Sequence, residues 1–163
     1  MHKSKNILFP LFFFIFIFML NTHILGINLE EYNYGLNVYK KGNCMGCHSW
    51  HGKGGGGYGA GVSLRKMNLT LDEIKNVIKC GRPGTGMPYF LRKAYKEEKC
   101  YDTTFKDYDD SYRPVSSKKF LSSKQIEAVS IFVKEVLHDK ELDKSYCEFF
   151  YEKGSKVCLN LNN

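Results

Sequence analysis

Apolar residues recur at spacings of three and four in three stretches of the chain, which is the period of a helix with one buried face. The stretches span residues 29–41, 71–80 and 123–137. The last has the longest apolar stripe, from Ile126 to Leu137. The pattern therefore predicts three amphipathic helices.

Residues that begin and end helices bound these stretches. Thr70 is followed three positions later by Glu73, the spacing of a capping box, and Ser122 or Ser123 can cap the last helix in the same way. Gly42 follows the first apolar stripe and is expected to end that helix. The agreement between stripe and boundary strengthens each helix prediction.

The segments between the helices carry the signals of loops. Four consecutive glycines occupy 54–57, and residues 83–90 contain two prolines and two glycines, so neither segment can be a helix or a central strand. Residues 100–119 are polar and aromatic without a period, which predicts a long surface loop. The pattern as a whole predicts one all-α domain with long loops.

The beginning of the chain is typical of an export segment. Basic residues within the first five positions precede an uncharged apolar run over 7–20. Cleavage near Gly26 is expected, and an uncleaved membrane anchor is the alternative. The prediction divides the chain into residues 1–26, a domain over 27–138, and a C-terminal tail over 139–163 that packs on the domain. We expect that domain and tail face an oxidising compartment, the periplasm.

The charge balance adds little about partners. The formal net charge is +7, and loss of Lys3 and Lys5 with the export segment leaves +5. This balance suits an acidic partner and equally suits an ordinary solvated surface. No dense run of Lys and Arg occurs, and an exported chain does not meet nucleic acid, so no nucleic-acid partner is expected.

One short motif carries specific chemistry. Cys44, Cys47 and His48 form C-x-x-C-H, the attachment signal of a c-type haem, in which two thiols bond the haem and the histidine ligates the iron. A zinc site would need a second pair of ligands, and a thioredoxin-like pair would need a βαβ pattern; neither occurs. A disulfide within the motif is geometrically tight. One covalent haem c is therefore the expected cofactor.

The remaining cysteines form an even set, which in an exported protein indicates two disulfides. Three pairings are possible, and short loops favour Cys80 with Cys100 and Cys147 with Cys158.

The second axial ligand of the iron is expected to be Met87. It lies in Gly86-Met87-Pro88, an irregular segment 39 residues beyond His48, far enough for the chain to circle the haem. Met45 lies inside the motif, Met67 lies in an ordinary stretch before a helix, and no other histidine is well placed. Thioether ligation favours ferrous iron and closes the iron to substrate, which predicts electron transfer.

These features together resemble class I c-type cytochromes over roughly residues 30–137. In that family the first and last helices cross at a close contact, for which Gly35 and Phe132 are the matching positions. The resemblance implies the cytochrome c fold, several short helices and long loops around one haem. The family's ligand histidine donates to a proline carbonyl, but no proline occurs between His48 and Arg82, so Val62 or a neighbour is expected to supply that carbonyl.

A narrower resemblance lies in the segments 80–89 and 94–101. They are similar to small periplasmic cytochromes that accompany quinoprotein alcohol dehydrogenases. It implies a dehydrogenase as electron donor, and a terminal oxidase or another cytochrome as acceptor. Trp50 and Tyr89 are expected at the porphyrin edge. Arg65 and Arg82 are candidates for pairing with the haem propionates or for simple surface charge.

The sequence thus predicts a single-electron carrier and not an enzyme. Two alternatives remain open: a haem enzyme such as a peroxidase, or a haem subunit of a larger oxidoreductase. A haem-based gas sensor is a third possibility, although no signalling domain accompanies this one.

Overall fold

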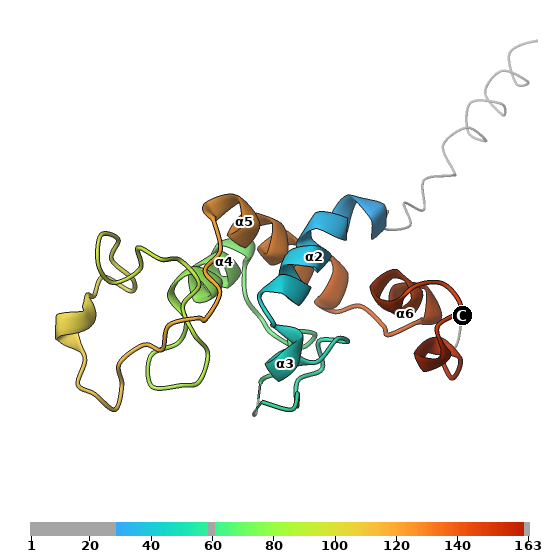
Figure 1. Ribbon diagram of the computed structural model, residues 1–163, viewed down its shortest axis with the longest axis horizontal. Helices are drawn as coiled ribbons and strands as arrows, with labels where there is room; N and C mark the ends of the chain where they lie inside the picture. Colours follow the sequence, from blue (N-terminus) through green and yellow to red (C-terminus); the bar gives the residue numbers. More distant parts are fainter. Residues whose placement is uncertain (1–28, 59–60, 162–163) are drawn as a thin grey trace, which may run out of the picture.

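The computed structural model describes residues 29–58 and 61–161, which form short helices joined by long loops (Figure 1). No strand forms in this described part of the chain, where β-type pairing is limited to isolated bridges, and the all-α class is confirmed. The expected export segment lies outside the described residues. Within the described ranges, no helix has both the length and the apolar character needed to cross a membrane.

The elements are η1 (Leu29–Tyr32), α2 (Asn33–Lys41), α3 (Met45–His48), α4 (Leu71–Cys80), η2 (Phe105–Asp107), α5 (Ser123–Phe132), η3 (Val133–Leu137), α6 (Lys144–Tyr151) and η4 (Lys156–Cys158).

Helices α2 and α5 approach each other closely at Gly35. A Cβ atom added there would lie 2.5 Å from the Ala128 carbonyl oxygen and 2.6 Å from the Phe132 Cβ. The rings of Tyr39 and Phe132 then pack at a centroid distance of 5.6 Å, and both side chains are fully buried. The apolar stripes of the two helices meet across this contact and form the centre of the core.

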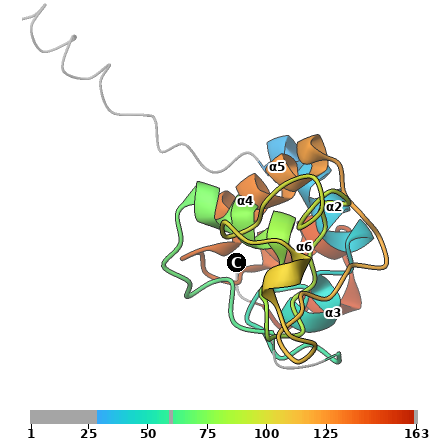
Figure 2. The same ribbon diagram turned by 90° about the vertical axis from the view of Figure 1, so that its left-hand side faces the viewer.

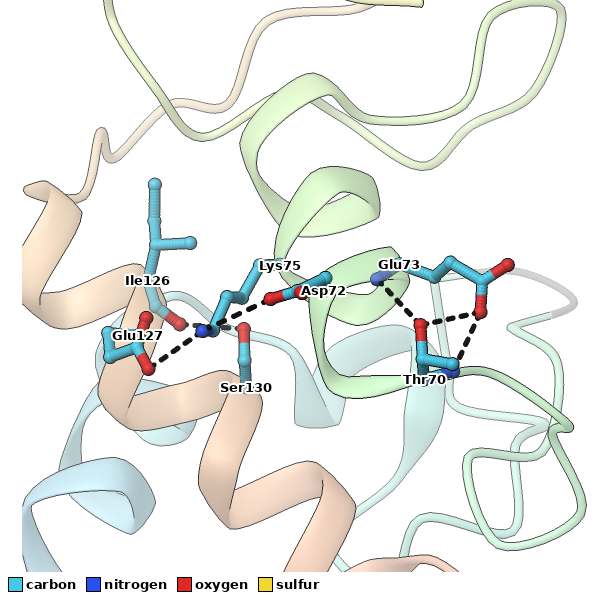
Figure 3. A network of polar contacts seen from close by, with 7 residues as sticks. All are labelled: Thr70, Asp72, Glu73, Lys75, Ile126, Glu127 and Ser130. Carbon is cyan, nitrogen blue, oxygen red and sulfur yellow. Dashed lines mark hydrogen bonds and ion pairs between the residues drawn. The ribbon is translucent and has the colours of Figure 1, made fainter.

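Capping boxes fix where α4 and α5 begin. The Thr70 side chain accepts from the amide of Glu73, whose carboxylate accepts from the Thr70 amide at 2.7 Å and from its hydroxyl at 2.8 Å (Figure 3). Ser122, and not Ser123, caps α5, with Gln125 completing the box. These side chains satisfy amide groups that the first helical turn leaves without partners.

A polar bridge joins the exposed sides of α4 and α5. The Lys75 ammonium lies 2.9 Å from a Glu127 carboxylate oxygen and 3.4 Å from one of Asp72, as Figure 3 shows. Behind it, the buried Ser130 hydroxyl donates to the Ile126 carbonyl at 2.7 Å. The ion pairs therefore lie on the solvent side of the contact between α4 and α5, and apolar side chains fill its inner side.

Helix α2 ends at Lys41 with Gly42 as its C-cap, as expected, whereas the helix expected over 123–137 changes type within its length. Gly42 keeps a helical φ of −71°, and Asn43 takes the left-handed conformation with φ 56°. Asparagine tolerates this conformation because its short polar side chain can bond locally. The last helix does not stay α-helical: it continues as a π-helix over Val133–Leu137, where the His138 amide donates to the Val133 carbonyl at 3.0 Å.

The long loop segment and the C-terminal tail lie at opposite ends of the molecule, with α2, α4 and α5 between them (Figure 1). Figure 2, seen from the first of these ends, places the segment around η2 in front of the helices. Each end contains one disulfide, Cys80–Cys100 and Cys147–Cys158, the pairing that short loops favour. In the tail, the Tyr146 hydroxyl donates to the Trp50 carbonyl at 2.6 Å, which joins the tail to the loop after α3.

Candidate functional site

The C-x-x-C-H motif forms a single helical turn. Helix α3 spans Met45–His48, with the amide of His48 donating to the Cys44 carbonyl at 2.8 Å. Positions three and four apart lie on one face of a helix, so Cys44, Cys47 and His48 share a face. Cys44 and Cys47 are both free thiols, although they are close in sequence. The motif therefore presents two thiols and an imidazole together.

The glycine-rich loop folds back onto this turn and satisfies its carbonyl groups. The amide of Gly54 donates to the His48 carbonyl at 3.1 Å, and that of Gly56 to the Cys47 carbonyl at 2.8 Å. A side chain on Gly56 or Gly61 would overlap the backbone of Gly46 or Cys47. Glycine is needed here because the two backbones touch.

This close approach carries a carbonyl group to the imidazole. His48 Nδ1 lies 2.8 Å from the Val62 carbonyl oxygen. The oxygen can only accept, so Nδ1 carries the proton and Nε2 keeps its lone pair. No residue in the described part of the chain forms a hydrogen bond with Nε2.

An apolar cavity of about 400 Å³ opens beside the motif. Its volume falls within the range of roughly 300–1,000 Å³ that is typical of ligand sites. Cys44, Cys47 and His48 form one part of its wall, and Met87 with its neighbours forms another. Apolar side chains from α4, α5 and η3 and from the loop before α4 complete the wall: Leu64, Leu69, Ile74, Val77, Ile78, Val129 and Val133.

Burial sets the protonation of the motif. It lowers the pKa of His48, partly opposed by the hydrogen bond to Val62, and the charge of Arg82 lowers it further. It raises the pKa of the Cys44 thiol to about 12. At neutral pH the site thus holds a neutral imidazole and a protonated thiol. A reactive redox cysteine has a lowered pKa instead, so Cys44 differs from a thioredoxin-type nucleophile.

Comparison with known proteins adds nothing to this geometry. No family model, curated protein or solved structure matches the chain. The interpretation of the candidate site is therefore based on the residues of this chain alone.

Two methionines line the cavity, not one. Met87 lines the cavity from the loop after α4, and Met67 lines it from the loop before α4. Met67 lies in a stretch with no motif, so its place in the cavity wall follows only from the path of the loop in the structure. Among the described residues, no group of three His, Cys, Asp or Glu side chains is placed to hold a metal ion together.

Trp50 and Tyr89, which the sequence analysis expects at the porphyrin edge, lie outside the wall of this cavity. Trp50 stacks on Tyr146 of the tail at a centroid distance of 6.0 Å, and Tyr89 packs among Tyr95, Phe105 and Phe120. Neither lines the cavity. Each belongs to an aromatic cluster of its own, and a place for either at the porphyrin edge stays a prediction. Tyr39 and Tyr58 line the cavity in their place.

The two arginines also separate. Arg82 lines the cavity and is exposed, while Arg65 is buried and does not line it. Arg65 donates to the carbonyl groups of His51 and Lys140 and lies over the Tyr146 ring. Its Nη2 is buried without a hydrogen-bond partner among the described residues. Arg65 is therefore neither surface charge nor part of the cavity wall.

Proposed function

We propose that this chain is a c-type cytochrome that carries single electrons, with haem bonded to Cys44 and Cys47 and its iron held between His48 and Met87. One observation carries the proposal. Four of the six cysteines form disulfides, and the two that remain free share an apolar cavity with a histidine and two methionines, one of them Met87.

The donor set suits haem better than a bare metal ion. The porphyrin supplies four of the iron's ligands, so a single histidine and a single thioether are enough from the protein. The apolar wall would exclude water from the macrocycle, and the two thiols on one helical turn could add to its vinyl groups as thioethers. Bound haem supplies an iron that accepts one electron as Fe(III) and releases it as Fe(II).

His48 is prepared to act as the proximal ligand. Its pKa is lowered by burial, so the imidazole is neutral at physiological pH. The hydrogen bond from Nδ1 to Val62 fixes the ring and leaves the Nε2 lone pair for iron. Such a bond to a carbonyl also raises the basicity of the ligand.

Met87 is proposed as the distal ligand because it lines the cavity from a loop that hydrogen bonds hold in place. The amide of Arg82 donates to the Met87 carbonyl at 3.0 Å, and the Met87 amide donates to the Thr85 hydroxyl at 3.2 Å. A ligand on a fixed loop closes the sixth position and keeps small molecules away from iron. This arrangement favours electron transfer over catalysis.

The compartment and partners follow from the same proposal. Two disulfides belong to an oxidising environment, in agreement with the expected export segment. We place the protein in the periplasm, where it would take electrons from a dehydrogenase, with a quinoprotein as the candidate, and pass them to a terminal oxidase or another cytochrome.

The test is the mass and the optical spectrum of protein matured in a bacterial periplasm. We expect a mass increase of one haem that survives denaturation, a sharp reduced c-type band and no change with carbon monoxide. The double variant Cys44→Ala/Cys47→Ala should lose covalent haem, while Cys147→Ala/Cys158→Ala should keep it. Wild-type protein without covalent haem would overturn the proposal. A shift with carbon monoxide would show an open iron and favour the haem enzyme.

A further inference from the structure

The loop that carries Met87 has a narrow neck. Gly81 ends α4 with φ 67°, and a side chain there would come within 2.7 Å of the Met87 oxygen and of the backbone of Pro88 and Tyr89. The two ends of the segment 82–87 are therefore in contact, and the segment is a closed loop. Its position depends on what holds the neck.

One side of the neck is held by residues 95–101. The Tyr95 hydroxyl donates to the Cys80 carbonyl and the Tyr101 hydroxyl to the Gly81 carbonyl, both at 2.7 Å. Cys80 is also bonded to Cys100. The last carbonyl groups of a helix have no partner inside it, so these hydroxyl groups complete the end of α4.

The other side is held by residues 112–117. The amide of Tyr89 donates to the Val115 carbonyl at 2.9 Å, and that of Ser117 donates to the Tyr89 carbonyl at 3.0 Å. At the tip of the loop, the Gly84 amide donates to the Tyr112 carbonyl at 3.1 Å. We call residues 95–117 the collar, because they hold the Met87 loop at its neck and at its tip.

We propose that the collar is the device that positions Met87: Tyr95, Tyr101 and the Cys80–Cys100 disulfide act through the neck and keep the thioether at the cavity. The inference rests on the proposed function, since it assigns the collar a task toward the iron ligand. The inference also gives a role to most of residues 100–119, which the sequence analysis describes only as a long surface loop without a regular hydrophobic pattern. Tyr95, Tyr101 and the disulfide are positioning residues and do not themselves touch the cavity.

The hydroxyl of Tyr101 is the most direct test. Tyr101 is 41% exposed, and Tyr101→Phe removes one hydrogen bond while it keeps the aromatic ring and its packing. Cyanide binds ferric haem only when the methionine leaves, so its binding rate measures how often the loop opens. We expect Tyr101→Phe to raise that rate roughly fivefold, which corresponds to about 1 kcal/mol, the worth of one hydrogen bond.

Tyr34→Phe is the matched control. Tyr34 is 46% exposed, lies on α2 outside the collar, and its hydroxyl forms no hydrogen bond with the described residues. Its variant should bind cyanide at the wild-type rate. Hydrogen exchange of residues 82–88, followed by mass spectrometry, should rise in Tyr101→Phe and stay unchanged in Tyr34→Phe.

The two disulfides give a second pair of variants. Cys80→Ala/Cys100→Ala should raise the cyanide-binding rate by roughly tenfold or more, since a disulfide that restrains a loop is commonly worth more than one hydrogen bond. Cys147→Ala/Cys158→Ala removes a disulfide at the far end and should lower stability while leaving the rate unchanged.

The outcomes separate the two proposals. A methionine bound to ferric haem gives a weak long-wavelength absorption band, the sulfur-to-iron band. Wild-type oxidised protein that lacks this band would overturn the assignment of Met87 itself, and the collar's task with it. Wild-type protein that has the band, with wild-type cyanide rates and exchange in Tyr101→Phe, would overturn the collar alone. Should the Cys80/Cys100 variant fail to mature, the tyrosine pair still decides.

Discussion

The carbonyl oxygen of Val62 accepts the hydrogen bond that orients the His48 ring. It fixes the His48 ring through Nδ1, while the Val62 side chain is 58% exposed. The task belongs to the backbone, so it depends on Gly56 and Gly61, which let the loop approach α3, more than on valine. Residues that act through their backbone leave little trace in side-chain chemistry.

Met87 and Met67 offer a direct comparison at the residue scale, because both line the cavity and both are thioethers. We expect Met87→Ala to lose the weak long-wavelength sulfur-to-iron band of the oxidised protein and to lower the reduction potential, since thioether ligation favours Fe(II). Met67→Ala should keep the band and lose only stability, by about 2–5 kcal/mol if the site cannot collapse. Optical spectra and redox titration of both variants are the measurement. Loss of the band in Met67→Ala alone would transfer the ligand assignment to Met67.

At the scale of elements, short helices depend on their ends. An isolated helix of ten residues is marginal in water, and α4 and α5 are each ten residues long. Both begin with a reciprocal capping box, and both bury an apolar stripe against the cavity or against α2. The caps fix where each stripe starts and therefore which side chains reach the cavity.

The two adjacent serines at the start of α5 test this dependence. Ser122 accepts from the Gln125 amide at 3.3 Å, whereas the Ser123 hydroxyl has no partner among the described residues. Ser122→Ala should lower the free energy of unfolding by about 1 kcal/mol, and Ser123→Ala should change it by less than about 0.5 kcal/mol. Chemical denaturation of both variants distinguishes them. Equal effects would contradict the assignment of the cap.

The cap of α4 should also give a pH dependence. Hydrogen bonds from the amide and the hydroxyl of Thr70 hold the pKa of Glu73 below its ordinary value of 4.5. The unfolded chain then takes up the proton first as pH falls, so the contribution of Glu73 is complete above pH 4.5 and is lost as pH falls through its lowered pKa. The stability difference between wild type and Glu73→Ala should therefore be constant from pH 7 to about 5 and narrow below that. A difference that does not narrow would contradict the shift.

At the scale of the whole molecule, the cavity lies between two irregular ends that are each closed by a disulfide. The collar holds the Met87 side, and the tail packs on the loop after α3, near the His48 side. Lys40 donates to the Phe150 carbonyl at 2.6 Å, and Tyr146 donates to Trp50. A domain of short helices gains rigidity where long loops are tied to one another.

We expect Arg65 to contribute strongly to the packing of the C-terminal tail on the domain. It joins the His51 and Lys140 carbonyl groups, and its loss leaves both without their donor. Arg65→Leu should lower the free energy of unfolding by about 3 kcal/mol and expose the chain after residue 139 to proteolysis. Arg92→Leu is the control, because Arg92 is exposed and its guanidinium contacts the Phe120 ring. A tail equally protected in both variants would contradict this role.

The sequence by itself determined the features that arise from neighbouring residues. The helix stripes, the capping box at Thr70 and the C-x-x-C-H turn follow from spacings of a few positions, because a helical turn brings such positions together. The two disulfides join positions 20 and 11 residues apart, and the sequence favoured this pairing among three because its loops are short. The interpretation of Met87 as an iron ligand also came from a local pattern, Gly86-Met87-Pro88, and it stays a prediction.

Only the tertiary structure decided which distant groups meet. It placed Met67 in the cavity, took Trp50 and Tyr89 into separate aromatic clusters, buried Arg65 beneath the tail and closed the collar around the Met87 loop. These contacts join positions up to about a hundred residues apart through backbone carbonyls and aromatic faces, which most residue types can supply. Such partners have no period and no motif, so they are specified by the packing of the whole chain and not by any short segment of it.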